Sequence, residues 1–191
     1  MKMLQKTILT SLLCASLQLA ASEGEIKEAI STATKHYQAG ELSQAIAQLD
    51  YASTLIRQEK GEQVKKAFPD APSGWQAEDA DSEVAGSAMF GGGITASRNY
   101  YNDQQRIEIQ LMMDSPMLQA FSMMLSNPSM IAMSGGKLTK IQGVQAVQKI
   151  EGEQLEIQFL APGGAMITLN GDKTAQSTML ALANAIDLKK L

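Results

Sequence analysis

The stretch Arg106-Ile107-Glu108-Ile109-Gln110-Leu111-Met112 alternates polar and apolar side chains as cleanly as any segment of the chain. Because successive side chains of a β-strand point to opposite faces of a sheet, this alternation predicts a strand with one buried face and one solvated face. Such strands are typical of antiparallel sheets, in which one face packs against a core. The stretch therefore predicts an antiparallel sheet whose apolar face is covered by a second layer.

Strand patterns of the same kind lie on both sides of this stretch. Asn102-Asp103-Gln104 predicts a hairpin turn to the strand before it, and short turns rich in glycine join the strands that follow. Connections this short join antiparallel neighbours. The predicted strands cover residues 94–101, 106–112, 138–141, 144–150, 155–160 and 166–170.

Two helices are predicted within and after these strands. The first begins at Asp114-Ser115-Pro116, with Ser115 as N-cap and the proline in the first turn, and runs to Met133 with a break at Asn127-Pro128. The second covers residues 174–188 and ends in two lysines, which are favourable at a helix C-terminus. The side chains expected to be buried in the second helix are Met179, Leu180, Leu182, Ala183 and Ile186.

Residues 23–68 predict a helical hairpin, with Gly40 at the turn between its two helices. Apolar residues recur every three or four positions, as they do on one face of a helix. The first stripe is Ile26, Ala29, Ile30, Ala33 and Tyr37, and the second is Leu42, Ala45, Ile46, Leu49, Ala52, Leu55 and Ile56.

Residues 37–52 carry the spacing Tyr-x2-Gly-x-Leu-x2-Ala-Ile-x2-Leu-x2-Ala, which resembles the core of a tetratricopeptide-like repeat. The resemblance covers about one repeat. It departs from the family where Ala29 and Thr32 replace large residues and where Arg57 replaces the terminating proline. A single repeat cannot bury its own apolar faces, so the resemblance implies a hairpin docked on something else.

The segment over residues 69–93 predicts a linker followed by an acidic and glycine-rich loop. Pro69 and Pro72 stop the preceding helix, and Gly91-Gly92-Gly93 precedes a strand. The predicted organisation is therefore a hairpin (23–68), a linker and loop (69–93) and an α+β domain (94–191), in which helices cover an antiparallel sheet.

Residues 1–22 predict a secretory signal peptide. Lys2 and Lys6 form a cationic start, residues 8–19 an apolar core, and Ala20-Ala21-Ser22 a small-residue region in which cleavage is expected near Ala21/Ser22. The apolar run is too short for a spanning helix. We therefore expect an exported protein of the periplasm with no membrane span and, since Cys14 is the only cysteine, no disulfide.

The charge balance disfavours two classes of partner. Against 16 Lys and Arg the chain has 20 Asp and Glu, a net charge of −4 at pH 7, and signal cleavage would remove two of the lysines. A negative protein is poorly suited to nucleic acid or to anionic lipid surfaces.

His36 is the sole histidine, and no Ser-His-Asp or Cys-His set can be built around it. The sequence predicts a protein that is no enzyme and uses no cofactor.

Methionine is concentrated in the first of the two later helices. Seven of the 12 methionines fall within residues 112–133, and apolar side chains spread around most of the helical wheel. One face can cover the sheet while a second face needs another contact, within the chain, in a homodimer or with a partner. The residues predicted to bind a partner are Met117, Phe121, Met124, Met130, Met133, Leu49 and Tyr37.

Copper is the alternative use of these sulfurs. Soft thioethers bind Cu(I), and methionines three or four residues apart share one side of a helix. The flanking histidines of copper carriers are missing, so a contact surface is favoured. The alternative Cu(I) ligands are Met113, Met117, Met130 and Met133.

The order of elements, with Gly74-Trp75 before a hairpin, a crossing helix, a meander and a final helix, resembles the small exported α+β domains of the Mog1/PsbP group and uncharacterised bacterial exported proteins. The resemblance implies an accessory or binding role. The predicted function is noncatalytic binding of an envelope protein or a small apolar ligand through the Met-rich helix and the hairpin.

Overall fold

The computed structural model describes residues 23–85 and 93–191. The predicted signal peptide and Gly91-Gly92 lie outside the described residues. The chain divides into two compact units, Met1–Glu59 and Lys60–Leu191, which we call the helical unit and the sheet unit. The protein is α+β as predicted, with helices followed by an antiparallel eight-stranded sheet and further helices.

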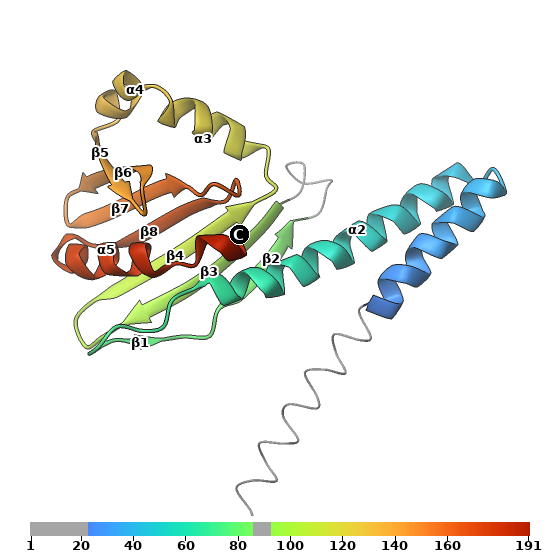
Figure 1. Ribbon diagram of the computed structural model, residues 1–191, viewed down its shortest axis with the longest axis horizontal. Coiled ribbons are helices and arrows are strands. Elements are labelled where there is room, and N and C mark those ends of the chain that lie inside the picture. Colours follow the sequence, from blue (N-terminus) through green and yellow to red (C-terminus); the bar gives the residue numbers. More distant parts are fainter. Residues whose placement is uncertain (1–22, 86–92) are drawn as a thin grey trace, which may run out of the picture. The chain divides into compact units, whose positions relative to one another are not determined.

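The helical unit is a hairpin of two helices. Helix α1 is described over residues 23–38, and α2 spans Leu42–Val64, so that its last turn belongs to the sheet unit. Gly40 has a φ of 77°, a left-handed conformation that a residue with a side chain adopts only with strain. The N–H of Glu41 donates to the carbonyl of His36 at 2.9 Å, which closes the end of α1. The predicted turn at Gly40 is confirmed, and the two helices run side by side (Figure 1).

The two helices meet through alanines. Ala29 and Ala33 of α1 and Ala45 and Ala52 of α2 are 3–5% exposed. The large side chains of the predicted stripes do not follow them into the contact: Ile30, Tyr37, Leu42, Ile46, Leu49 and Ile56 are all exposed. Because alanine allows close approach of two helices, it leaves no room between them for the larger residues of the same stripe.

The eight strands form one antiparallel sheet with the order β1-β3-β4-β8-β7-β6-β5, and β2 pairs with β3 beside β1. All six predicted strands are confirmed. The strands are β1 Gln76–Ala77, β2 Asp81–Ala85, β3 Gly93–Tyr101, β4 Arg106–Met113, β5 Gly136–Ile141, β6 Val144–Glu151, β7 Gln154–Leu160 and β8 Met166–Asp172.

The prediction of a linker and loop over residues 69–93 is wrong for its middle part, which contains β1 and β2. Both pair with β3, β2 along the first five residues of β3 and β1 at its end. Asp81, Ser82 and Glu83 have low β-propensity, so the local sequence gives no strand signal. Residues 76–77 and 81–85 are extended because their backbones pair with β3, although their residue types do not favour a strand.

One face of the sheet makes the main core. The alternation predicted for β4 is observed, since Ile107, Ile109 and Leu111 are fully buried while Glu108 and Gln110 lie on the other face and are partly exposed. Ile109 pairs with Leu169 of β8, which pairs in turn with Ile157 of β7. This buried face is covered by α5 (Gln176–Ala185) and by the end of α2 with the short helix η1 (Lys65–Ala67) (Figure 1).

The predicted helix over residues 116–133 is divided into α3 (Met117–Leu125) and α4 (Pro128–Met133), which confirms the break at Asn127-Pro128. Ser115 is not the N-cap residue, because α3 begins one position later with Pro116 as the cap. Its hydroxyl nevertheless accepts a hydrogen bond from the N–H of Met117 at 3.3 Å.

The final predicted helix is shorter than expected. It consists of η2 (Lys173–Ala175), α5 and η3 (Leu188–Lys190). The carboxylate of Asp172 accepts hydrogen bonds from the backbone N–H and hydroxyl of Thr174, which lower the pKa of Asp172 and start η2. The predicted buried positions Met179, Leu182, Ala183 and Ile186 are confirmed, and Leu180 is partly buried. None of the described helices has the length and apolarity to cross a bilayer.

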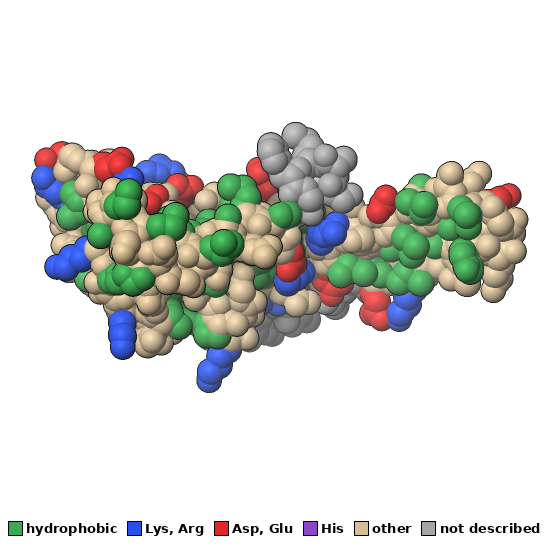
Figure 2. All heavy atoms as spheres, turned by 90° about the horizontal axis from the view of Figure 1, so that it is seen from above, with side chains coloured by type: hydrophobic (Ala, Val, Ile, Leu, Met, Phe, Trp, Pro, Cys, Tyr) green, Lys and Arg blue, Asp and Glu red, His purple; other side chains and the backbone are tan. Residues whose placement is uncertain are grey.

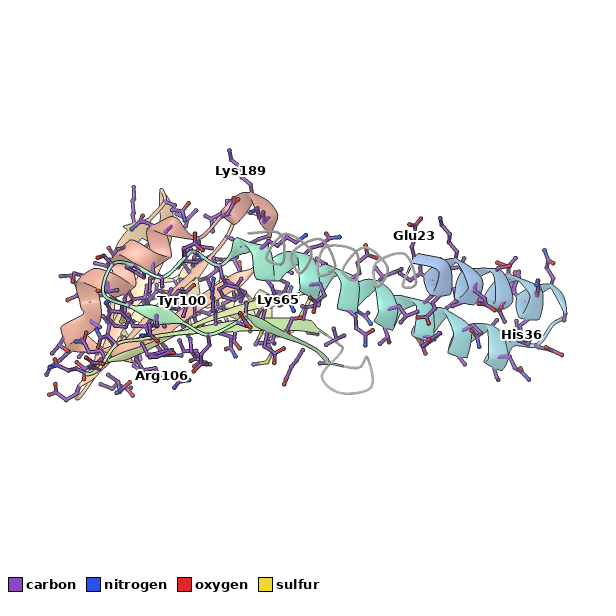
Figure 3. The ribbon with its side chains drawn as sticks, turned by 90° about the horizontal axis from the view of Figure 1, so that it is seen from below. Glu23, His36, Lys65, Tyr100, Arg106 and Lys189 are labelled. Atoms are coloured by element: carbon purple, nitrogen blue, oxygen red, sulfur yellow. The ribbon has the colours of Figure 1, made fainter. Side chains whose placement is uncertain are left out.

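Residues 69–78 are fixed to β3 by two side chains. The carbonyl of Pro69 accepts hydrogen bonds from the Tyr100 hydroxyl at 2.7 Å and from an Arg98 guanidinium nitrogen at 3.0 Å. Arg98 also donates to the carbonyl of Glu78 and lies 5.6 Å from the centre of the Tyr100 ring. Tyr100 lies inside the sheet unit (Figure 3), and its burial raises the pKa of its hydroxyl to about 12.

We predict that Tyr100→Phe makes stability less sensitive to alkaline pH. The pKa of Tyr100 in the folded state, about 12, exceeds its ordinary value of 10.0, so the fold favours the neutral phenol. This contribution is full below pH 10 and is lost as the pH rises through 12. Urea unfolding between pH 8 and 11.5 should show a smaller alkaline loss in Tyr100→Phe than in the native chain, with a cost of about 1 kcal/mol at pH 8 from the lost hydrogen bond.

Tyr101→Phe is the matched control, because Tyr101 is the next residue of β3 and points to the other face. It should retain the alkaline loss of the native chain. An identical pH dependence for the two variants would contradict the assignment.

Candidate functional site

Helices α3 and α4 pack on the face of the sheet opposite the main core. Leu125 of α3 and Ile131 of α4 are buried against Val147 of β6, with Phe121 and Leu160 partly buried around them. Val147 and Leu160 alternate with the core residues Ala146 and Phe159, so they lie on the second face. The α3–α4 segment therefore has a small apolar contact of its own, separate from the main core.

Three local interactions fix the α3–α4 segment. The side-chain amide of Gln145 donates to the carbonyl of Leu125 at 2.8 Å and satisfies the C-terminal end of α3. Asn127 caps α4 by accepting from the backbone N–H groups of Ser129 and Met130. Gly136 of β5 lets α4 approach the sheet closely, because an added Cβ would stand 2.9 Å from a methyl group of Ile131.

The outer side of this segment carries exposed methionines. Met117, Met123, Met130 and Met133, which we call the methionine surface, are 51–88% exposed. Each belongs to α3 or α4, whose inward side chains already contact the sheet. The methionine surface is therefore apolar area that the described residues leave uncovered.

Most of the predicted binding residues of this segment are found on or beside the methionine surface. Met117, Met130 and Met133 are exposed, whereas Phe121 and Met124 are half-buried, and Phe121 contacts the buried cluster. Met123 was not among the predicted binding residues. The helical wheel does not show which side of α3 is exposed; in the structure Leu125 is buried, Leu118 and Phe121 are partly buried, and Met123 is exposed.

The methionines of the alternative Cu(I) set do not share one environment. Met113 is 3% exposed at the end of β4 and belongs to the main core. Met117, Met130 and Met133 are exposed. Three of the four predicted sulfurs thus belong to the methionine surface, and the fourth is held among the apolar side chains of the sheet.

A second apolar surface lies on the helical unit. It is a groove of about 390 Å³ between α1 and α2, and Figure 2 shows hydrophobic side chains gathered along the hairpin. Its larger side chains are 44–69% exposed. The hairpin groove is lined by Ile30, Ala33, Thr34, Tyr37, Leu42, Ala45, Ile46 and Leu49.

The hairpin groove brings together two predicted binding residues, Tyr37 and Leu49. Ile30, Leu42 and Ile46 belong to the same groove but were predicted only as packing positions of the hairpin. The sequence signal that separates packing positions from groove positions is residue size. The alanines at 29, 33, 45 and 52 form the contact between the helices, and the larger residues remain at the rim of the groove.

Two polar side chains in and near the hairpin groove, Thr34 and His36, have partners within the hairpin. The Thr34 hydroxyl donates to the carbonyl of Ile30 at 2.9 Å, and no residue that lines the groove is ionised at neutral pH. His36 lies at the turn end of the hairpin (Figure 3), where its Nδ1 pairs with a carboxylate oxygen of Glu41. The groove is consequently an uncharged and mainly apolar surface.

Charged groups of the sheet unit are dispersed. Among the described residues, no three His, Cys, Asp or Glu side chains are grouped closely enough to hold a metal ion. Two further depressions, both polar, lie at the second face of the sheet, one of them around Glu108, Asn170 and Asp172.

No protein-family model, curated protein or solved structure matches the chain. Function is therefore inferred from the methionine surface and the hairpin groove themselves.

We predict that Gly136→Ala destabilises the packing of α4 on the sheet by about 1–3 kcal/mol, the usual cost of overpacking. The new methyl group would stand 2.7 Å from a methyl of Val147 and 2.9 Å from one of Ile131. Urea unfolding should show the loss, and backbone hydrogen exchange in residues 128–133 should become faster.

Gly24→Ala is the control for this substitution. A Cβ at Gly24 has nothing within 4 Å, and because alanine favours a helix over glycine, this variant should be as stable as the native chain or slightly more stable. A Gly136→Ala chain as stable as the native one would contradict the close approach of α4.

Proposed function

We propose that this chain is a noncatalytic binding protein of the bacterial periplasm, which contacts an envelope protein or a small apolar ligand through the methionine surface. The supporting observation is that Met117, Met123, Met130 and Met133 are all at least 51% exposed on one short segment. The hairpin groove offers a second apolar contact. The predicted signal peptide supports the periplasmic location.

The chemistry of methionine suits this role. Its side chain is unbranched and polarizable, so a surface of methionines can adapt to partners of different shape. Contiguous apolar patches are rare on the surface of monomeric proteins and mark sites of interaction. A segment with four exposed methionines is therefore better explained by a partner than by the stability of the chain.

The packing of α3 and α4 supports the same conclusion. Leu125 and Ile131 already bury the inner side of the segment against Val147. The methionines on the outer side add nothing to that contact, and polar residues there would have been equally compatible with the fold.

The resemblance of residues 37–52 to a tetratricopeptide-like repeat supports a binding role as well, because such repeats present surfaces to other proteins. The proposed relation to the Mog1/PsbP group points in the same direction.

We predict that Met123→Asp and Met133→Asp each weaken capture of the partner from envelope extract by roughly tenfold or more, the loss typical of an interface hot spot. Met123 and Met133 are exposed, so a carboxylate is tolerated in the free chain but is desolvated without a partner in the complex. The partner is captured on the immobilised full chain and quantified by mass spectrometry.

Ile150→Asp is the matched control, because Ile150 is also an exposed apolar residue of the sheet unit but lies on β6 outside the methionine surface. It should capture the partner as the native chain does. Undiminished capture by both methionine variants, with unchanged circular dichroism, would remove the methionine surface from the function.

Copper binding is the competing hypothesis for the same sulfurs. Anaerobic titration of the chain with Cu(I) against a competing chelator distinguishes the two. We expect no affinity in the micromolar range, since Met113 is held in the core away from solvent. Micromolar binding that is lost in Met117→Leu would favour copper.

A further inference from the structure

We propose that the hairpin groove binds the same groove of a second copy of this chain, so that two hairpins form a four-helix bundle. The proposal rests on the proposed role of the hairpin as a contact surface and names its partner. It involves none of the residues of the methionine surface, to which the partner of the proposed function would bind.

The spacing of the exposed residues on α2 is that of a coiled-coil seam. Leu42, Ile46, Leu49 and Ile56 follow the alternating steps of four and three residues that place side chains in one stripe along a helix, with Ser53 at the intervening position. All four are exposed. On α1, Ile30 and Tyr37 stand one heptad apart and border the same groove. Both helices therefore present exposed apolar side chains at the spacing with which side chains of one helix insert between those of another.

The groove lacks the features of a small-molecule site. Pockets for small ligands carry a few placed polar groups that fix the orientation of the ligand. The hairpin groove has only two hydroxyls, on Thr34 and Tyr37, and that of Thr34 donates within its own helix. A groove that offers mainly apolar contacts along two helices suits the apolar stripe of another helix.

The charges of the groove are compatible with a second copy as its occupant. The chain is acidic, with a net charge of −4, so two copies repel each other over most of their surfaces. The residues that line the hairpin groove carry no charge at neutral pH. A two-fold contact places this neutral surface against itself, which is the arrangement that costs two acidic chains least.

The available area agrees with a reversible dimer. Residues 42–56 extend over about 22 Å of helix, and two helices side by side are about 20 Å wide. The flat footprint is thus roughly 400 Å², below the roughly 800 Å² that each partner buries in a standard interface. The contact is large enough for association that depends on concentration and too small for a permanent dimer.

The experiment is sedimentation equilibrium of the full chain from the low micromolar range to several hundred micromolar. We expect a mass that rises from monomer to dimer. Leu49→Asp should weaken dimerisation at least tenfold, because two carboxylates would meet in the apolar contact.

Tyr51→Asp is the matched control. Tyr51 is 50% exposed and Leu49 is 53% exposed, both on α2, and a two-residue step turns about 200° around a helix, so Tyr51 points away from the groove. The control should dimerise as the native chain does.

Equal loss of dimer in both variants would overturn the proposal, as would a monomer at every concentration. A monomer that binds the apolar dye anilinonaphthalene sulfonate, with binding abolished by Leu49→Asp, would also overturn it and assign the groove to small ligands. Failure of dimerisation alongside intact capture of a partner by the methionine surface would leave the proposed function standing. The two proposals are therefore separable.

Discussion

The continuous apolar face of the sheet is the constraint on which the sheet unit depends. Ile109, Leu169 and Ile157 lie side by side on three adjacent strands and are fully buried, so they require a covering layer along the middle of the sheet. That layer comes from widely separated parts of the chain, α5 at one end of the sequence and Val64, Ala67 and Phe68 at the other. The second face is largely polar, and α3 and α4 cover it where they meet Val147 and Leu160.

In the helical unit, by contrast, the contact between the two helices is too small to bury all their large apolar side chains. Four alanines form the contact, and the isoleucines, leucines and tyrosine beside them remain at the surface. Alanine contributes little burial per residue, whereas each large aliphatic side chain would contribute about 1.5–3 kcal/mol if covered. The hairpin therefore carries an unused driving force for association, and the same holds on a smaller scale for the methionine surface.

The sequence was informative where local pattern and tertiary structure agree. Strand alternation at Arg106–Met113 and the break at Asn127-Pro128 both depend on neighbouring residues, and both were predictable. Strands β1 and β2 were not, because β1 is only two residues long, β2 begins with an acidic stretch, and both are ordered by pairing with β3. The orientation of α3 was unpredictable for a related reason. Because apolar residues lie around most of α3, its sequence does not show which side is buried. Leu125 is the residue that contacts Val147 of the sheet.

The contacts between the last residues and the end of α2 have a consequence for biosynthesis. The N–H of Asp187 donates to the carbonyl of Ala67 at 3.0 Å, and the ammonium of Lys190 donates to that of Lys66. The central strand β4 likewise pairs with β8, which lies some sixty residues later in the sequence. Contacts so distant in sequence slow folding, since a long loop must close before any of them forms. The sheet unit of a nascent chain thus cannot complete its core until translation has passed Ile186, a delay that would suit the export that we propose.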